Sequence, residues 1–436
     1  MIKFLFFIIS YIALTNFAFA DNNEVAIADP VEITFIFNTL LFCIGGFLVM
    51  WMAAGFTMLE AGLVRSKNTV VICIKNVGLF SIAGTAYYLI GYNLMYSGVD
   101  GGYLGSISIW SSGISSPSDL IGQSYSPASD WFFQMVFVAT TASIVSGALA
   151  ERILIWPFFA FVTILTALLY PISGSWQWGG GWLSEMGFSD FAGSTIVHSV
   201  GGWAALTGAL ILGARKGKYN TDGTTNIMPG QSIPMATLGV WILWLGWFGF
   251  NGASQLALGS YIDADAVATI FANTSMAAAG GVMGAMILSR LIYGKTDISA
   301  TLNGAIAGLV SITAEPLTPV IGEAIIIGAV GGILCMYGMK LLDKLKIDDV
   351  VGAIPAHLIA GIWGTLIVPF TNTDTSYVIQ IIGILAFGLF TVIASTIVWL
   401  ILKSTVGIRA SEEDEAYGLD LSEAGSVGYP EYTSKK

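Results

Sequence analysis

Eleven apolar runs of about twenty residues dominate the sequence, and they constrain its fold more than any other feature. An α-helix rises about 1.5 Å per residue, so about twenty residues cross the roughly 30 Å hydrocarbon core of a bilayer. Of the 436 residues, 55% are hydrophobic and 10% are charged. A single soluble core stops growing beyond ~250–300 residues, which excludes a soluble fold for such a chain. We therefore predict an all-α polytopic membrane protein with eleven transmembrane helices. The predicted spans are 33–62, 70–97, 129–150, 153–173, 191–214, 233–253, 267–291, 298–314, 319–341, 352–370 and 377–403.

The distribution of lysine and arginine predicts which ends of these spans face the cytoplasm. Every basic residue after position 20, except Lys75, falls in the last two residues of an odd-numbered span or in the segment that follows it. The segments on the other side, including the long loop at 98–128, contain no lysine or arginine. Because cytoplasmic segments of membrane proteins carry the basic residues, we predict a mature N-terminus outside and a cytoplasmic C-terminus. Lys75 lies inside the second span, and we expect its side chain to snorkel to the cytoplasmic face.

The first twenty residues, MIKFLFFIISYIALTNFAFA, have the features of a cleaved secretory signal peptide. A lysine precedes an apolar stretch, and an Ala-Phe-Ala sequence ends it. An uncleaved first span is the alternative. We divide the chain into a signal peptide at 1–20, a transmembrane domain at 21–403, and a cytoplasmic C-terminal tail at 404–436. A signal peptide followed by many spans indicates a multi-pass protein of the plasma (inner) membrane.

The only two histidines of the chain lie inside predicted spans, in similar surroundings. His198 follows Asp190 by eight residues in the fifth span, and His357 follows Asp349 by eight residues in the tenth. The two spans enter from opposite faces, and eight helical residues reach about 12 Å, so both histidines approach the middle of the bilayer. An odd number of spans per repeat inverts the second copy. We therefore predict inverted five-helix repeats, formed by the first five and the next five spans, plus one C-terminal span.

Polar side chains within a membrane are functional candidates by default, which makes the histidine pair the first candidate site. The alternative is a pair of hydrogen-bonded packing residues. Asp190 stands at the outer start of the fifth span, where its carboxylate can cap free N–H groups of the helix.

Several other classes of protein are disfavoured by the residues present. Catalytic zinc needs three protein ligands and an open position, and two histidines fall short of that set. Cys43, Cys73 and Cys335 have no metal-ligand spacing, and no G-x-S-x-G sequence is present. No basic patch with interleaved aromatic residues suggests a nucleic-acid partner. We therefore expect no enzyme activity, no cofactor and no bound nucleic acid.

Motifs spread along the whole mature chain resemble those of one known family, the ammonium transporters of the Amt/Mep/Rh family. They are AGLVRSKN (61–68), SGALAER (146–152), WGGGWL (178–183), DFAGSTIVH (190–198), GWFGFNGAS (246–254), TLNGAIAGLVSITA (301–314), DDVVGAIPAH (348–357) and GLDLSEAG (418–425). The resemblance implies a homotrimer in which each subunit of eleven helices has its own pore. The chain departs from the family at Gly352, where members often carry an acidic residue.

The resemblance also implies roles for individual residues. They are pore histidines at His198 and His357, a phenylalanine gate at Phe137 and Phe250, an ammonium recruitment site of Phe137, Trp178 and Ser254, and vestibule support from Asp190. Elementary chemistry agrees with these roles, because aromatic faces attract a small cation and a serine oxygen accepts a hydrogen bond from ammonium.

The expected function is therefore an ammonium transporter or channel for nitrogen uptake. It would recruit ammonium in an outer vestibule, deprotonate it, and conduct ammonia past the histidines with or without a relayed proton. An ammonium sensor with little transport and a Rh-like channel for the neutral gas are the alternatives. The resemblance further implies that the tail packs under the bundle and that a cytoplasmic PII-type protein regulates the transporter.

Overall fold

The computed structural model describes residues 29–432, so the predicted signal peptide lies outside the described residues. Within 29–432 the chain forms helices and loops with no named strand, apart from two isolated bridge pairs. The α-helices are α2 (Pro30–Leu63), α3 (Thr69–Ala86), α4 (Tyr92–Tyr96), α5 (Pro127–Ala148), α6 (Ile155–Ile164), α7 (Tyr170–Ser175), α8 (Trp182–Glu185), α9 (Val200–Leu212), α10 (Ile233–Gly252), α11 (Tyr261–Tyr293), α12 (Ile298–Thr313), α13 (Ile321–Lys344), α14 (Ala360–Ile367), α15 (Tyr377–Thr405), α16 (Glu412–Tyr417) and α17 (Leu419–Ala424).

Shorter helical segments of two kinds join or extend these helices. The wider π-helical segments are η2 (Tyr87–Gly91), η4 (Leu165–Leu169), η5 (Ser194–Ser199) and η7 (Ile354–Ile359). The tighter 3₁₀ segments are η1 (Ser66–Asn68), η3 (Pro117–Leu120), η6 (Ala253–Gln255), η8 (Val368–Phe370) and η9 (Pro430–Tyr432). π-Helical turns within α-helices are rare and frequently mark functional sites.

The predicted all-α membrane fold is confirmed by these helices. In the part of the chain that the structure describes, nine helical stretches are long and apolar enough to cross a membrane, judged by length and composition. Two shorter apolar stretches, Ile298–Thr313 and Ile354–Phe370, coincide with the predicted eighth and tenth spans. The count of eleven stays a prediction, because each of these two stretches is shorter than a typical span.

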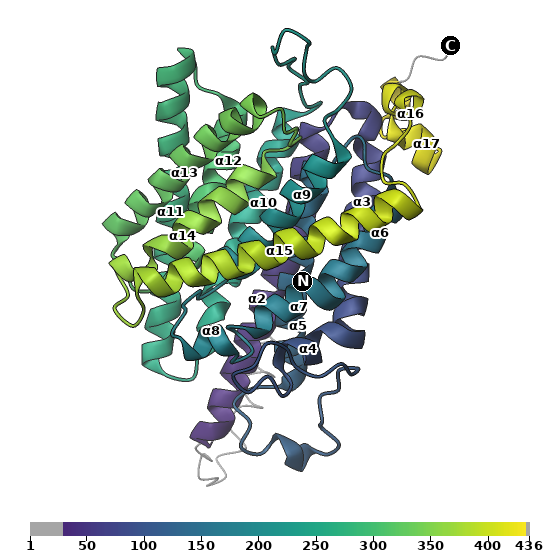
Figure 1. Cartoon of the computed structure of the whole chain (residues 1–436). Coiled ribbons are helices and arrows are strands. Elements are labelled where there is room, and N and C mark those ends of the chain that lie inside the picture. Colours follow the sequence, from purple (N-terminus) through teal and green to yellow (C-terminus); the bar gives the residue numbers. More distant parts are fainter. Residues whose placement is uncertain (1–28, 433–436) are drawn as a thin grey trace, which may run out of the picture.

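The long helices pack side by side, and α15 runs obliquely across one side of the bundle (Figure 1). The most extensive contacts join α2 to α10 and α11 to α13. Glycine makes the second of these contacts close: a Cβ at Gly332 of α13 would lie 2.1 Å from the carbonyl oxygen of Gly281 in α11. In lipid, small residues of this kind let helix backbones approach without a hydrophobic driving force.

The expectation that Lys75 snorkels to the surface is wrong. Its side chain is fully buried in α3, its Nζ donates a hydrogen bond of 2.9 Å to the carbonyl oxygen of Ser146, and it lies 4.8 Å above the ring of Phe158. The reason is that α3 packs against α5 and α6, so the lysine points into the bundle. The carboxylate of Glu60 supplies the opposite charge nearby.

A buried ion-pair cluster joins loops at the end of the bundle that the predicted topology places in the cytoplasm. Arg215, which follows α9, donates to both carboxylate oxygens of Asp348 at 2.8 and 2.9 Å and to Glu151 at 3.2 Å. Arg65 binds the same Glu151 at 2.5 Å. Burial alone would raise the pKa of Asp348, but the hydrogen bonds of Arg215 and the charge of Arg152 outweigh it, and the pKa lies well below its usual range.

Candidate transport pathway

The two histidines meet at the centre of the bundle. The Nδ1 atom of His198 lies 3.2 Å from the Nδ1 atom of His357, and both rings are buried. The rings stack with their centroids 5.2 Å apart. Each histidine lies in a π-helical segment, His198 in η5 and His357 in η7. The sequence predicted both depths, and the structure brings the two side chains together.

An aspartate fixes the start of each of these π-helical segments. The carboxylate of Asp190 accepts four backbone N–H bonds of 2.8–3.0 Å, from Gly193, Ser194, Thr195 and Ile196. In the other half, Asp349 accepts bonds from the N–H groups of Gly352 and Ile354. The donors of a helix start lack intrahelical partners, so such a cap selects where the segment begins. An aspartate cap of the same kind therefore positions the histidine in each half of the chain.

Glycine is needed in both caps. Gly193 has a φ of +108° and Gly352 has a φ of +80°, a region that other residues rarely adopt. A Cβ at Gly352 would also lie 2.8 Å from Nδ2 of Asn303. Gly352, where members of the family often carry an acidic residue, thus fits this cap, because an acidic side chain here would be strained and crowded.

Two phenylalanine rings lie next to the histidines. Phe137 of α5 and Phe250 of α10 are buried and stack with centroids 4.0 Å apart. The ring of Phe250 lies 5.2 Å from that of His198, and Trp247 covers His198 on another side at 5.0 Å. In the state described, the stacked rings separate the histidines from the cavity above.

That outer cavity has a volume of about 500 Å³ and contains all three predicted recruitment residues, Phe137, Trp178 and Ser254, in its wall. The Trp178 ring meets Phe137 edge-on at 5.9 Å. The hydroxyl of Ser254 donates to the carbonyl oxygen of Phe250 at 2.8 Å, which leaves its oxygen free to accept a bond. Asp190 does not line this cavity, but its carbonyl oxygen accepts a bond of 2.9 Å from Nε1 of Trp178.

Sequence reasoning missed several polar residues of the outer cavity. Asp130, Gln134 and Tyr92 line it, and the hydroxyl of Tyr92 donates to the carboxylate of Asp130. The signal was present in the spacing: Asp130, Gln134 and Phe137 lie at i, i+4 and i+7 and so share one face of α5.

Two further cavities continue the path on the other side of the histidines. The first, of about 10 Å³, is lined by His357 together with Glu60, Ser143 and Asn303. The second, of about 150 Å³, shares Asn303 with the first and opens among charged residues of the loops that the predicted topology places in the cytoplasm, and we call it the cytoplasmic cavity. The order is thus an outer cavity, a phenylalanine pair, a histidine pair, a small inner cavity and a cytoplasmic cavity.

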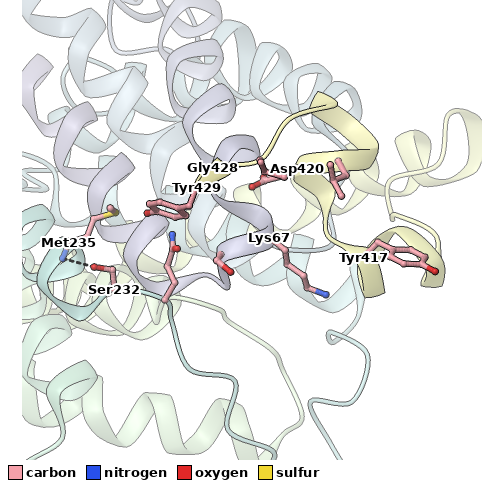
Figure 2. A pocket seen from close by; sticks show the side chains of 11 residues that line it. Lys67, Ser232, Met235, Tyr417, Asp420, Gly428 and Tyr429 are labelled. Carbon is pink, nitrogen blue, oxygen red and sulfur yellow. Dashed lines mark hydrogen bonds between the residues drawn. The ribbon is translucent and has the colours of Figure 1, made fainter. Parts of the chain in front are cut away.

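A separate cavity of about 820 Å³ lies between the C-terminal tail, η1 and the first turn of α10 (Figure 2). Lys67 on its wall donates to the carbonyl oxygens of Glu415 and Ala416 at 2.8 and 2.5 Å. Asp420 of α17 accepts a bond of 2.9 Å from the N–H of Val71. This cavity shares no lining residue with the path through the histidines. It belongs to the contact between tail and bundle.

Residues 29–432 contain no cluster of three or more histidine, cysteine, aspartate or glutamate side chains placed to hold a metal ion. The cavities along the path are lined by aromatic rings, an imidazole, carboxylates and hydroxyls.

Comparisons with known proteins agree on one family. The sequence profile of the Ammonium Transporter Family matches residues 40–429. Ammonium transporter Amt2 of Archaeoglobus fulgidus is 39% identical over 444 residues, which cover 94% of this chain and 92% of that protein. A solved structure named Sensor Amt Protein matches with a TM-score of 0.84 and 34% identity, covering 90% of this chain and 99% of that chain. Mep2 of Candida albicans matches with a TM-score of 0.79 and 26% identity, covering 94% and 95%. The chain therefore belongs to the Ammonium Transporter Family.

Proposed function

We propose that this protein recruits ammonium in the outer cavity, removes its proton and conducts ammonia past His198 and His357, with or without relaying the proton. The observation that carries the proposal is the enclosed imidazole pair, 3.2 Å from Nδ1 to Nδ1, directly behind the stacked Phe137 and Phe250 rings. A cation that meets the phenylalanine rings is attracted to their faces, but nothing on the histidines carries a negative charge to accompany it further.

The energies support loss of the proton before passage. An unpaired charge at the centre of a bilayer costs from ~3 to more than ~10 kcal/mol. Removing a proton from an amine with a pKa near 10 costs about 4 kcal/mol at pH 7, at ~1.4 kcal/mol per pH unit. Deprotonation is therefore competitive for ammonium and has no counterpart for potassium. The proposed pore would reject potassium by chemistry, since the two ions have the same charge and similar sizes.

The hydrogen bond between the imidazoles determines what they offer to ammonia. An Nδ1 to Nδ1 bond needs one protonated and one unprotonated nitrogen, so two neutral rings expose one Nε2 acceptor and one Nε2–H donor. Nε2 of His198 has no hydrogen-bond partner among the described residues. A passing ammonia molecule could satisfy it, and a row of such bonds is also a route for a relayed proton.

A sensor with little transport is the second candidate function. It is favoured by the similarity to the structure named Sensor Amt Protein, at 34% identity and a TM-score of 0.84. A Rh-like channel for neutral gas is disfavoured by the recruitment residues Trp178 and Ser254, which suit capture of a cation.

We further infer from the resemblance a homotrimer in the plasma (inner) membrane, with the mature N-terminus outside, a cytoplasmic tail, and a PII-type regulator at the cytoplasmic exit. Charged residues line that exit, among them the exposed Asp343 and the part-exposed Lys218, which supports a protein partner there. The physiological role would be nitrogen uptake, with no enzymatic step and no resident cofactor.

The decisive experiment is an electrical one. Purified protein in a lipid bilayer should carry a current when ammonium is added and none when potassium is added. Bilayers without protein give the baseline. Ammonia uptake into vesicles without current would support neutral passage, and the absence of both would favour the sensor.

A further inference from the structure

The inner cavity next to His357 is the right size for a single small molecule. Its volume of about 10 Å³ is roughly that of one water-sized probe, the least that a single water needs. Ammonia and ammonium are close to water in size. Polar groups of Glu60, Ser143 and Asn303 share its wall with His357 and with apolar side chains.

Glu60 brings an unsatisfied hydrogen-bond acceptor to this cavity. Its side chain is 1% exposed, and its Oε2 accepts a bond of 2.7 Å from the hydroxyl of Ser146. Its other oxygen, Oε1, has no hydrogen-bond partner among the described residues. A buried acceptor without a donor costs about 1–3 kcal/mol, and more when it is charged. The site is therefore complete only when a donor occupies it.

The charged neighbour of the Glu60 carboxylate is Lys75. Lys75 donates to the carbonyl oxygen of Ser146, the residue whose hydroxyl binds Glu60, so Ser146 stands between the two charges. Arg152 lies beyond Lys75 and adds to the positive side. Asn76 is the remaining polar neighbour of Glu60. The alternative is that Glu60 forms an ion pair with Lys75 and only stabilises the fold. The experiment has to distinguish this role from the binding of a permeating molecule.

We propose that Glu60 forms an inner ammonium site on the cytoplasmic side of the histidines. Ammonia that has passed them takes up one proton, either the relayed proton or one from water on the cytoplasmic side, and the resulting ammonium ion donates an N–H bond to Oε1. This inference rests on the proposed function, because it concerns the same path. The carboxylate offers the permeant its first negative charge after the histidines. Its position next to the cytoplasmic cavity, with which the inner cavity shares Asn303, makes it the last site before release.

The first test replaces Glu60 by glutamine, which keeps the shape but removes the charge. Ammonium current should then need at least tenfold more ammonium for half-saturation. The double variant Glu60→Gln/Lys75→Met removes both charges together. If Glu60 binds ammonium, the double variant stays as weak as the single one; if Glu60 only neutralises Lys75, the double variant regains wild-type half-saturation. Glu32→Gln, an exposed change at the other end of α2, is the matched control and should behave as wild type.

A second variant covers the case in which the Glu60 variants do not fold, as judged by gel filtration and thermal unfolding. Ser143→Val adds a methyl group to the wall of the cavity and touches neither charge, because the Ser143 hydroxyl donates only to the carbonyl of Ala139. It should raise the half-saturating concentration at least tenfold. A wild-type value in Ser143→Val, in Glu60→Gln or in the double variant overturns the inner site alone. A wild-type protein that carries no ammonium at all overturns the proposed function instead.

Discussion

At the scale of single residues, the site depends on two carboxylates that cap the π-helical segments carrying the histidines. Asp190 and Asp349 hold the starts of η5 and η7 and thereby set the depth of the histidines. The imidazoles can then bond to each other without support from any third side chain. Their hydrogen bond is the most sensitive point of the proposed mechanism.

We predict that His198→Ala and His357→Ala each reduce ammonium current at least tenfold or allow potassium to pass. Either variant leaves one imidazole without its partner and opens space that water can enter, so a charged ion no longer meets a dry barrier. Current in a bilayer with ammonium and then potassium measures both outcomes. Full ammonium current with potassium still excluded, in either variant, would show that the pair is packing.

Two carboxylates of the buried ion-pair cluster, Asp348 and Glu151, predict that the folded protein loses stability in acid. The pKa of Asp348 in the folded protein lies below its value of ~3.9 in the unfolded chain. Asp348 therefore adds to the free energy of unfolding above about pH 4, and this contribution is lost as the pH falls toward the folded pKa. The pKa of Glu151 is also lowered, because Arg215 and Arg65 outweigh the effect of burial, and it acts in the same direction.

Thermal unfolding should therefore shift to lower temperature below about pH 4. Asp348→Asn should cost ~3–5 kcal/mol at pH 7, since it leaves Arg215 buried beside a neutral group, and should flatten the dependence on pH. Glu412→Gln removes an exposed partner of Lys216 and serves as the control, with little change expected. Equal stability of wild type and Asp348→Asn at pH 7 would contradict this account.

At the scale of elements, the tail is tied to several parts of the bundle. Residues after α15 bond to Arg152, to the end of α9 through Arg409, and to Lys67, while Asp420 binds the first turn of α3. Helix α3 also carries Lys75, the partner of Glu60. The tail is thus joined by one rigid helix to the inner part of the path.

Truncation after Val406 should accordingly reduce or deregulate ammonium transport while trimers remain intact. Asp420→Asn, which weakens one cap but keeps the rest of the tail, should give a smaller change in the same direction. Uptake with and without added PII protein, and gel filtration for assembly, are the measurements. Unchanged uptake and an unchanged response to PII would leave the tail without a regulatory role.

At the scale of the whole molecule, the proposed topology gives its own test. In a variant lacking Cys43, Cys73 and Cys335, single cysteines at Ser111 and Asn220 should react with an impermeant reagent from opposite sides. Both positions are exposed, and they lie in a loop without basic residues and in a loop with three. Reaction of both from the same side would contradict the eleven-span arrangement.

Much of this architecture follows from the sequence, because hydrophobic length and the placement of basic residues act locally along the chain. The depths of His198 and His357 were predictable for the same reason. Glu60 was missed, although it is the only acidic residue in the first predicted span. Its role depends on Ser146 and Lys75, which come from two other helices, and a pattern within one helix does not reveal such neighbours.

The two halves of the molecule are joined at three levels. The hydroxyls of Thr195 and Thr365 lie 2.7 Å apart, the histidines bond below them, and Arg215 holds Asp348 at the cytoplasmic end. A cycle of rocking between halves would have to break all of these bonds on every turnover. We therefore expect these contacts to stay closed during transport, so that the protein needs no large movement between one permeating molecule and the next.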